Sequence, residues 1–173
     1  LRLRKPDTAP VYAERLLTLI PEKYHKRIVV HDHFYLKEEY KLKGIHLSHR
    51  NPIVPDNYSG HVSASCHTFE EVIADKKMCD YVFLSPIFDS ISKEGYHAGF
   101  TSEEIREAAA KGIIDKRVIA LGGVDEDNIL QVKDFGFGGA AILGGLWNKF
   151  NPASDYNYQE LIAHFRKLKR LAD

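Results

Sequence analysis

Three charged side chains of the sequence have the chemistry of a phosphate site. Arg4 and Lys93 are cations, and Asp32 offers a carboxylate oxygen of the kind that Mg²⁺ prefers. Two cations and one Mg²⁺-binding carboxylate around a single cavity would bind a diphosphate. Because these residues lie far apart in the sequence, the fold has to bring them together.

Two glycine pairs point to a second anion site. Gly122 and Gly123 follow one apolar run, and Gly144 and Gly145 follow another. Glycine lets the backbone approach an anion closely, so that N–H groups can bind it. Turn glycines without a ligand are the alternative. The matching positions of the two pairs favour phosphate binding.

The sequence HDH at residues 31–33 has three interpretations. Alternate residues of a strand share a face, so His31 and His33 would chelate a metal together. Alternatively, Asp32 is a Mg²⁺ ligand at the end of a strand. In the third interpretation Asp32 caps the next segment and the histidines are solvated. The zinc interpretation lacks a carboxylate or lysine partner after the later strands.

Other reactive side chains are expected to have structural roles. Cys66 and His67 are adjacent on a predicted strand and therefore point to opposite faces, which disfavours a nucleophile and base couple. We expect Cys66 to be an inert, buried thiol. His46 is expected to pack or to form hydrogen bonds, and His164 to be a surface or packing residue.

The composition excludes several classes of partner. Lys plus Arg and Asp plus Glu both number 24, so no net field holds nucleic acid or a membrane surface against the protein. No apolar run approaches the roughly 20 residues of a membrane-spanning helix. The two cysteines lack metal-type spacing. These features predict a protein of the reducing cytoplasm and leave a homo-oligomer open.

Seven apolar or β-branched runs alternate with helix-like patterns. Near-continuous apolar strands in βα alternation are typical of a parallel sheet that is buried on both faces. Helix-like patterns include residues 9–20, 102–111, 125–136 and 158–168. The predicted strands are residues 1–4, 27–32, 44–48, 61–65, 81–85, 117–123 and 139–145.

The strand count favours a (β/α)₈ TIM barrel that lacks its first βα unit in this sequence. A closed barrel needs eight strands, whereas an open doubly wound sheet can stop at seven. The sequence begins inside a predicted strand, and about 30 more residues would supply one further βα unit. We therefore expect a single barrel domain over residues 1–173. Its reactive groups would lie at the carboxyl ends of the strands.

The strand-end segments resemble a known family. LRLRK, VVHDH, GIHLSHRN, SASCHTFEEV, FLSPIFDSISK, ALGGV and AAILGG occur in the order and spacing of the thiamine phosphate synthase family, which includes the TenI-type thiazole tautomerases. The resemblance extends from Leu1 to about Trp147. Its most specific part is SPIFDSISK, where two serines replace the threonines of the family pattern.

The resemblance implies roles for individual residues. Ser90, Ser92 and Lys93 would bind phosphate groups of the substrates. Arg4 and Ser65 would contact the diphosphate of the pyrimidine substrate, and Asp32 would bind Mg²⁺. The cradle for the thiazole phosphate would be Gly122, Gly123, Leu143 and Gly144.

Four positions depart from the family pattern. Arg2 falls where the synthases usually carry a glutamine that reads the pyrimidine. His31, a predicted substrate-binding residue, replaces the asparagine that usually precedes Asp32. Asn51 replaces the second metal-binding aspartate. Pro6 falls on a family lysine, for which Lys5 is the neighbouring substitute. An asparagine offers Mg²⁺ only a neutral carbonyl oxygen, so its replacement of aspartate weakens the predicted metal site.

The resemblance implies a thiamine phosphate synthase that joins hydroxymethylpyrimidine diphosphate to thiazole phosphate with Mg²⁺. One alternative is a TenI-like tautomerase, in which His67 would be the general acid and base. Another alternative is a non-catalytic paralogue that binds thiazole phosphate.

Overall fold

The computed structural model describes residues 2–3, 10–89, 97–148, 150–151, 153 and 157–173 of the chain. The chain divides into two compact units. Unit 1 is Leu1–Ser65 with Met78–Tyr81, and unit 2 is Cys66–Lys77 with Val82–Asp173. Among the described residues, no helix has the length and apolar character that crossing a membrane requires. The single domain expected from the length stays a prediction.

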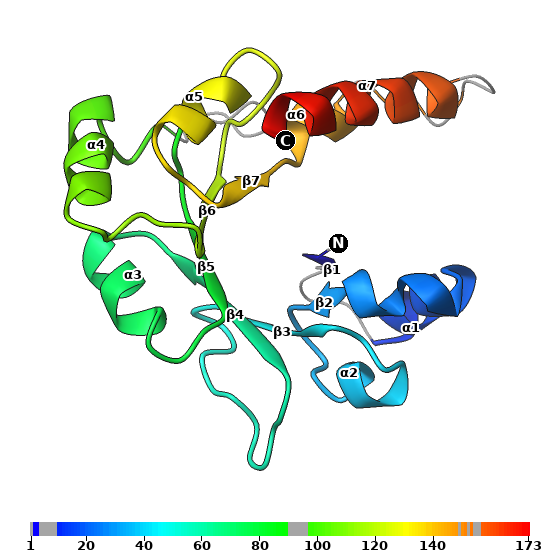
Figure 1. Cartoon of the computed structure of the whole chain (residues 1–173). Coiled ribbons are helices and arrows are strands. Elements are labelled where there is room, and N and C mark those ends of the chain that lie inside the picture. The colour runs from blue at the N-terminus through cyan, green and yellow to red at the C-terminus, as the bar shows by residue number, and fades with distance from the viewer. Residues whose placement is uncertain (1, 4–9, 90–96, 149, 152, 154–156) are drawn as a thin grey trace. The chain divides into compact units, whose positions relative to one another are not determined.

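Unit 1 is built on parallel strands that follow one another in chain order. Arg2 pairs with Val29, and Val29 pairs with Gly44. Gly44 pairs in turn with His61. The elements are β1 (Arg2–Leu3), α1 (Val11–Leu19), the 3₁₀ helix η1 (Glu22–Arg27), β2 (Val29–Val30), α2 (Leu36–Glu39), β3 (Gly44–Leu47) and β4 (His61–Cys66), whose last residue belongs to unit 2 (Figure 1).

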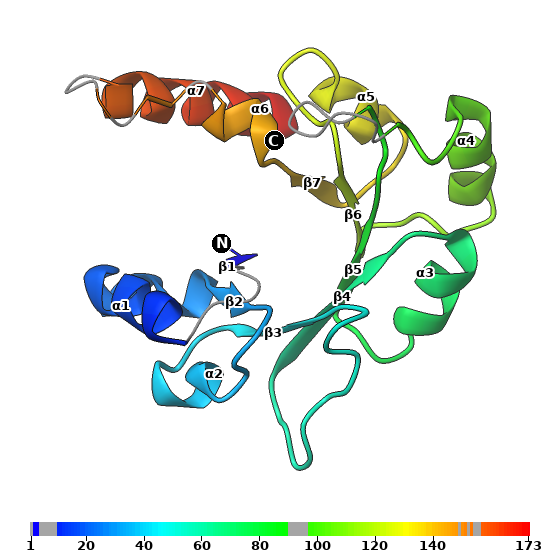
Figure 2. The same ribbon diagram turned by 180° about the vertical axis from the view of Figure 1, so that it is seen from behind.

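Unit 2 continues the alternation of parallel strands and helices. Val82 pairs with Val118, and Ile119 pairs with Gly139. Helices α6 and α7 lie side by side in both views (Figures 1 and 2). The elements are α3 (Phe69–Asp75), β5 (Tyr81–Leu84), α4 (Ser102–Ala110), β6 (Val118–Leu121), α5 (Ile129–Asp134), β7 (Gly139–Ala141), α6 (Gly144–Trp147) and α7 (Asn157–Ala172).

The seven predicted strands are all present, and their parallel pairing confirms the α/β class. Burial explains why the apolar runs revealed them. Val30, Ile45, Val82 and Val118 are at most 1% exposed, and every residue of β2 and β3 is buried, as in a strand covered on both faces. The closed eight-stranded barrel stays a prediction.

Helix α4 begins where its sequence predicts. The Thr101 hydroxyl accepts a hydrogen bond from the Glu104 N–H, and the Glu104 carboxylate accepts one from the Thr101 N–H at 2.7 Å. These bonds to Thr101, from its backbone N–H and then its hydroxyl, lower the pKa of Glu104. Ile105 and Ala108 form the buried face of the helix.

Helix α5 begins later than its sequence predicts. The expected cap is Asp125, but the helix starts at Ile129. The Asn128 side chain accepts a hydrogen bond from the Asp125 N–H at 3.0 Å and donates one to the Gly123 carbonyl at 2.9 Å. A local side-chain bond of this kind competes with helix formation, so residues 125–128 form a turn instead.

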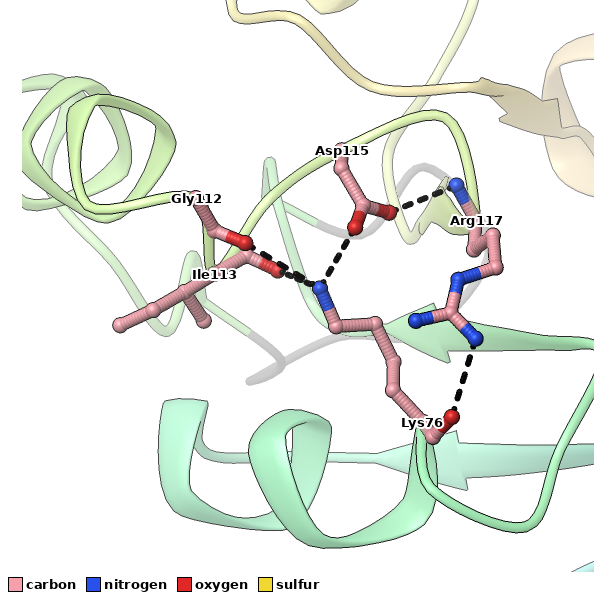
Figure 3. Close-up of polar contacts among 5 residues, drawn as sticks. All are labelled: Lys76, Gly112, Ile113, Asp115 and Arg117. Carbon is pink, nitrogen blue, oxygen red and sulfur yellow. Dashed lines mark hydrogen bonds and ion pairs between the residues drawn. The ribbon is translucent and has the colours of Figure 1, made fainter.

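A lysine joins the end of α3 to the connection between α4 and β6 (Figure 3). Lys76 Nζ donates hydrogen bonds to the carbonyls of Gly112 at 3.2 Å and Ile113 at 2.7 Å, and to the Asp115 carboxylate at 2.8 Å. Arg117 donates to the Lys76 carbonyl at 3.0 Å. The Lys76 side chain is only 10% exposed, so these acceptors replace water around its charge.

The same contacts set the ionisation of Asp115. Burial alone would raise the pKa of Asp115, but the Lys76 hydrogen bond and the Arg117 N–H outweigh it, so the pKa is lowered from its ordinary value. The Arg117 N–H lies 2.8 Å from the second carboxylate oxygen. The carboxylate is therefore held in its charged form.

We expect Lys76→Met to lower the free energy of unfolding by about 1–3 kcal/mol, because three acceptors lose their charged donor. Urea denaturation followed by circular dichroism measures this change. The control is Lys77→Met, since Lys77 is the exposed neighbour and its replacement should change stability by less than about 0.5 kcal/mol. Equal effects of the two substitutions would show that the Lys76 contacts do not stabilise the unit.

Stability should depend on pH through Asp115. Its folded-state pKa lies below the ordinary value, so its contribution is present above the unfolded-state pKa and is lost as pH falls through the folded-state pKa. Asp115→Asn should therefore be less stable than the wild type at pH 7, with a difference that shrinks below about pH 4. Urea denaturation between pH 7 and pH 3 tests this. A difference that stays constant would contradict the assignment.

Candidate active site

Asp32 and Asn51 lie together in unit 1. Asn51 Nδ2 donates a hydrogen bond to Asp32 Oδ1 at 2.8 Å. Asp32 follows β2, while Asn51 is turned back toward it by two backbone hydrogen bonds with Ser48, 3.1 and 2.9 Å long. The carboxyl ends of β2 and β3 thus bring together the two residues that the sequence proposes as metal ligands.

A buried histidine connects β3 with β4. The two ring nitrogens of His46 each lie 2.8 Å from a serine hydroxyl, one of Ser63 and one of Ser65. His46 and Ser63 are fully buried, and the His31 ring lies 4.2 Å from the His46 ring between centroids. A neutral imidazole donates from one nitrogen and accepts at the other, so the network orients the Ser65 hydroxyl. The predicted structural role of His46 is confirmed.

The metal interpretations of HDH differ in how they fit this geometry. Strand β2 ends at Val30, and His33 has a φ of 55°, so the strand alternation that would pair His31 with His33 is not present. Among the described residues, no group of three His, Cys, Asp or Glu side chains is arranged to hold a metal. Asp32 with the Asn51 amide fits a Mg²⁺ ion that takes most of its ligands from water and substrate phosphates.

The loops that follow β5, β6 and β7 touch through glycines in unit 2. Gly122 and Gly123 have φ values of 96° and 65°, which side chains disfavour. A Cβ on Gly123 would lie 2.2 Å from the Asp89 carbonyl oxygen, and one on Gly145 would lie 2.5 Å from that of Val124. Backbone therefore meets backbone directly at both contacts.

This arrangement leaves donors available for an anion. Within the described part of the chain, the N–H groups of Gly123 and Gly144 donate to no carbonyl. Leu143 is exposed and immediately precedes the short helix α6, which begins with the second glycine pair. Successive N–H groups in such a turn form an anion-binding concavity.

His67 has a defined orientation at the end of β4. Its Nδ1 lies 2.9 Å from the Ser85 carbonyl oxygen, which accepts a hydrogen bond from it. The neutral tautomer that this bond selects carries its basic lone pair on Nε2. Thr68 follows as the cap of α3, so the exposed ring lies between a strand and a helix. Cys66 beside it is buried, as predicted.

The structure does not place every residue that the sequence proposes. Its described residues divide between the units, with His31, Asp32, Asn51 and Ser65 in unit 1 and His67, Gly122, Gly123, Leu143 and Gly144 in unit 2. The residues outside the described part are Arg4, Lys5, Ser90, Ser92 and Lys93. Sequence reasoning missed the link from His46 to Ser65, and only the strand register, which pairs His46 with Ser63, reveals it.

Several curated proteins are similar to this chain in sequence. The thiamine-phosphate synthase of Dictyoglomus turgidum is 34% identical over 120 residues, which are 66% of this chain and 53% of that protein. The thiamine-phosphate synthase of Actinobacillus succinogenes is 28% identical over 125 residues, or 68% of this chain and 56% of that protein. The chain thus spans about half the length of the curated relatives it matches.

Two solved structures that are similar to this chain are described as thiamine phosphate pyrophosphorylases. A thiamine phosphate pyrophosphorylase from Bacteroides thetaiotaomicron is 60% identical with a TM-score of 0.88, covering 99% of this chain and 82% of that one. A thiamine phosphate pyrophosphorylase from Pyrococcus furiosus has a TM-score of 0.71 at 16% identity, covering 98% of this chain and 82% of that one, which supports the fold alone. The family model described as thiamine monophosphate synthase, TMP-TENI, matches residues 2–146. The chain therefore belongs to the thiamine monophosphate synthase family.

Proposed function

We propose that the protein is a thiamine-phosphate synthase, which joins hydroxymethylpyrimidine diphosphate to thiazole phosphate and releases pyrophosphate. The observation that carries this proposal is the 60% identity, over 99% of the chain, to a protein described as a thiamine phosphate pyrophosphorylase. The geometry supports it, because an oriented carboxylate and hydroxyl in unit 1 and backbone N–H donors of the glycine pairs in unit 2 suit two phosphate-bearing substrates.

The pyrimidine diphosphate would be bound by side chains. Arg4 and Lys93 supply fixed positive charge, and Ser65, oriented by His46, supplies a hydroxyl donor. Asp32 and the carbonyl oxygen of Asn51 would hold Mg²⁺, once the Asn51 amide turns from its present hydrogen bond. When bound, this ion would neutralise charge on the departing diphosphate.

The thiazole phosphate would be bound mainly by the backbone. The N–H groups of Gly122 and Gly123 and those around Leu143 and Gly144 are suited to phosphoryl oxygens. Ser90 and Ser92 would add hydroxyl groups. Because the backbone donors are fixed by strand ends and close glycine contacts, they need little reorganisation when the substrate binds.

The proposed reaction needs no protein nucleophile. The C–O bond between the pyrimidine methylene and the diphosphate breaks, and its electron pair leaves with the diphosphate. The methylene carbon becomes cation-like, and the lone pair of the thiazole nitrogen forms the new C–N bond. The cations Arg4 and Lys93 would stabilise the leaving group.

A second candidate function rests on His67. The hydrogen bond from its Nδ1 to the Ser85 carbonyl fixes a ring whose Nε2 can accept and return a proton. That is the requirement for a thiazole phosphate tautomerase, which would use the glycine loops without the diphosphate site. A cytoplasmic location is proposed for either activity, and two buried cysteines that are not joined in a disulfide are compatible with a reducing compartment.

The decisive experiment incubates the protein with Mg²⁺, the pyrimidine diphosphate and thiazole phosphate, and detects thiamine phosphate by chromatography. We expect product with Mg²⁺ and none after EDTA treatment. Lys93→Ala should lower kcat about 100-fold or more, because a charge that stabilises the leaving group is lost. Lys111→Ala is the matched control, since the Lys111 side chain is exposed and pairs with Glu107 of α4 at 3.3 Å.

Two outcomes would overturn the synthase proposal or part of it. An unchanged rate in Lys93→Ala would remove that residue from the mechanism. Thiazole phosphate isomerisation without any thiamine phosphate, abolished by His67→Gln, would select the tautomerase instead.

We also expect His46→Leu to lower the free energy of unfolding by about 1–3 kcal/mol, because the hydroxyls of Ser63 and Ser65 lose their partner. The KM for the pyrimidine diphosphate should rise as Ser65 loses its orientation. The control combines His46→Leu with Ser63→Ala and Ser65→Ala, which should recover much of the stability but not the KM. Wild-type stability of His46→Leu would disprove the network's role.

A further inference from the structure

Helix α7 contacts the second glycine pair, Gly144 and Gly145, which begins α6. His164 of α7 lies with its Nε2 2.7 Å from the Gly145 carbonyl oxygen in α6, so the ring nitrogen donates a hydrogen bond to the backbone. The His164 side chain is 11% exposed, so little water competes for this bond. Both views show α6 alongside α7 (Figures 1 and 2). The carbonyls of a four-residue helix depend on such outside donors.

The same helix also contacts the loop that follows the first glycine pair. Lys167, one turn after His164, forms an ion pair with Glu126 at 2.9 Å. His164 Nδ1 lies 3.7 Å from the same carboxylate, which is too long for a hydrogen bond, so Lys167 is the closer partner of Glu126. One face of α7 thus holds residues of both loops.

These contacts act on loops that already touch. A Cβ on Gly145 would lie 2.5 Å from the Val124 carbonyl oxygen, so the two glycine loops meet without an intervening side chain. Gly145 follows Gly144, and Val124 follows Gly123, whose N–H groups would bind the thiazole phosphate. A shift of Gly145 relative to Val124 would therefore change the spacing of these donors.

We propose that His164 is a positioning residue for the phosphate site formed by the glycine loops. Its hydrogen bond to Gly145 holds α6 against α7, and the ion pair of Lys167 with Glu126 holds the loop after Gly123 against the same helix. This inference rests on the proposed function, because it assumes that the loops bind the thiazole phosphate. His164 lies beyond residues 2–146, which the family model matches.

Two polar substitutions test the hydrogen bond. A glutamine amide nitrogen reaches the position of the histidine Nε2, whereas that of asparagine is too short. We expect His164→Asn to raise the KM for thiazole phosphate about tenfold, the effect of one lost hydrogen bond, with a smaller change in kcat. His164→Gln should stay close to the wild type. The control on the same helix is Lys169→Met, which removes an exposed ion pair with Asp173.

Calorimetric titration with thiazole phosphate separates this inference from the proposed function. If the wild type makes no thiamine phosphate but binds thiazole phosphate, the synthase proposal fails, and the Kd values of the two variants still decide the role of His164. Equal Kd values for wild type and His164→Asn would overturn the inference. Equal weakening in both variants would also overturn it, because the donor at Nε2 would then be irrelevant. A wild type that binds no thiazole phosphate overturns both.

Discussion

Parallel pairing of neighbouring strands is the constraint on which the candidate site depends. It places the carboxyl ends of β2 and β3 at one edge, so that Asp32 and Asn51 meet at 2.8 Å. In unit 2 it does the same for β6 and β7, whose glycine loops touch through their backbones. Residues separated by tens of positions in the sequence become neighbours because the strands are in register.

Much of the fold was predictable from the sequence because burial dictates it. Apolar runs revealed the strands, since most of the strand side chains are buried. The start of α4 was predictable because its cap, from Thr101 to Glu104, is local in sequence. The start of α5 was predicted wrongly, because Asn128 uses its side chain to bond Asp125 and Gly123, and residue type does not reveal that choice.

The candidate site was predictable to a smaller extent. The rule that reactive groups follow the strands located Asp32, Asn51 and the glycine loops. The bond from His46 to Ser65 depends on the register between β3 and β4, and a slip of one residue would turn these side chains to opposite faces. The contact of His164 with Gly145 depends on how a helix packs against a distant loop, which no local pattern encodes.

The two proposed phosphate-binding sites differ in whether backbone or side-chain groups bind the phosphate. The proposed thiazole phosphate cradle uses backbone donors, so it tolerates changes of side chain as long as Gly122, Gly123 and Gly145 keep their close contacts. The proposed diphosphate site uses side chains, so each replacement changes its charge directly. Asn51 is such a replacement, because a neutral amide beside Asp32 leaves one negative charge where two carboxylates would attract a metal more strongly. If Asp32 binds Mg²⁺ as proposed, the oxygens of the diphosphate would supply the remaining negative ligands, and metal binding would be coupled to substrate binding.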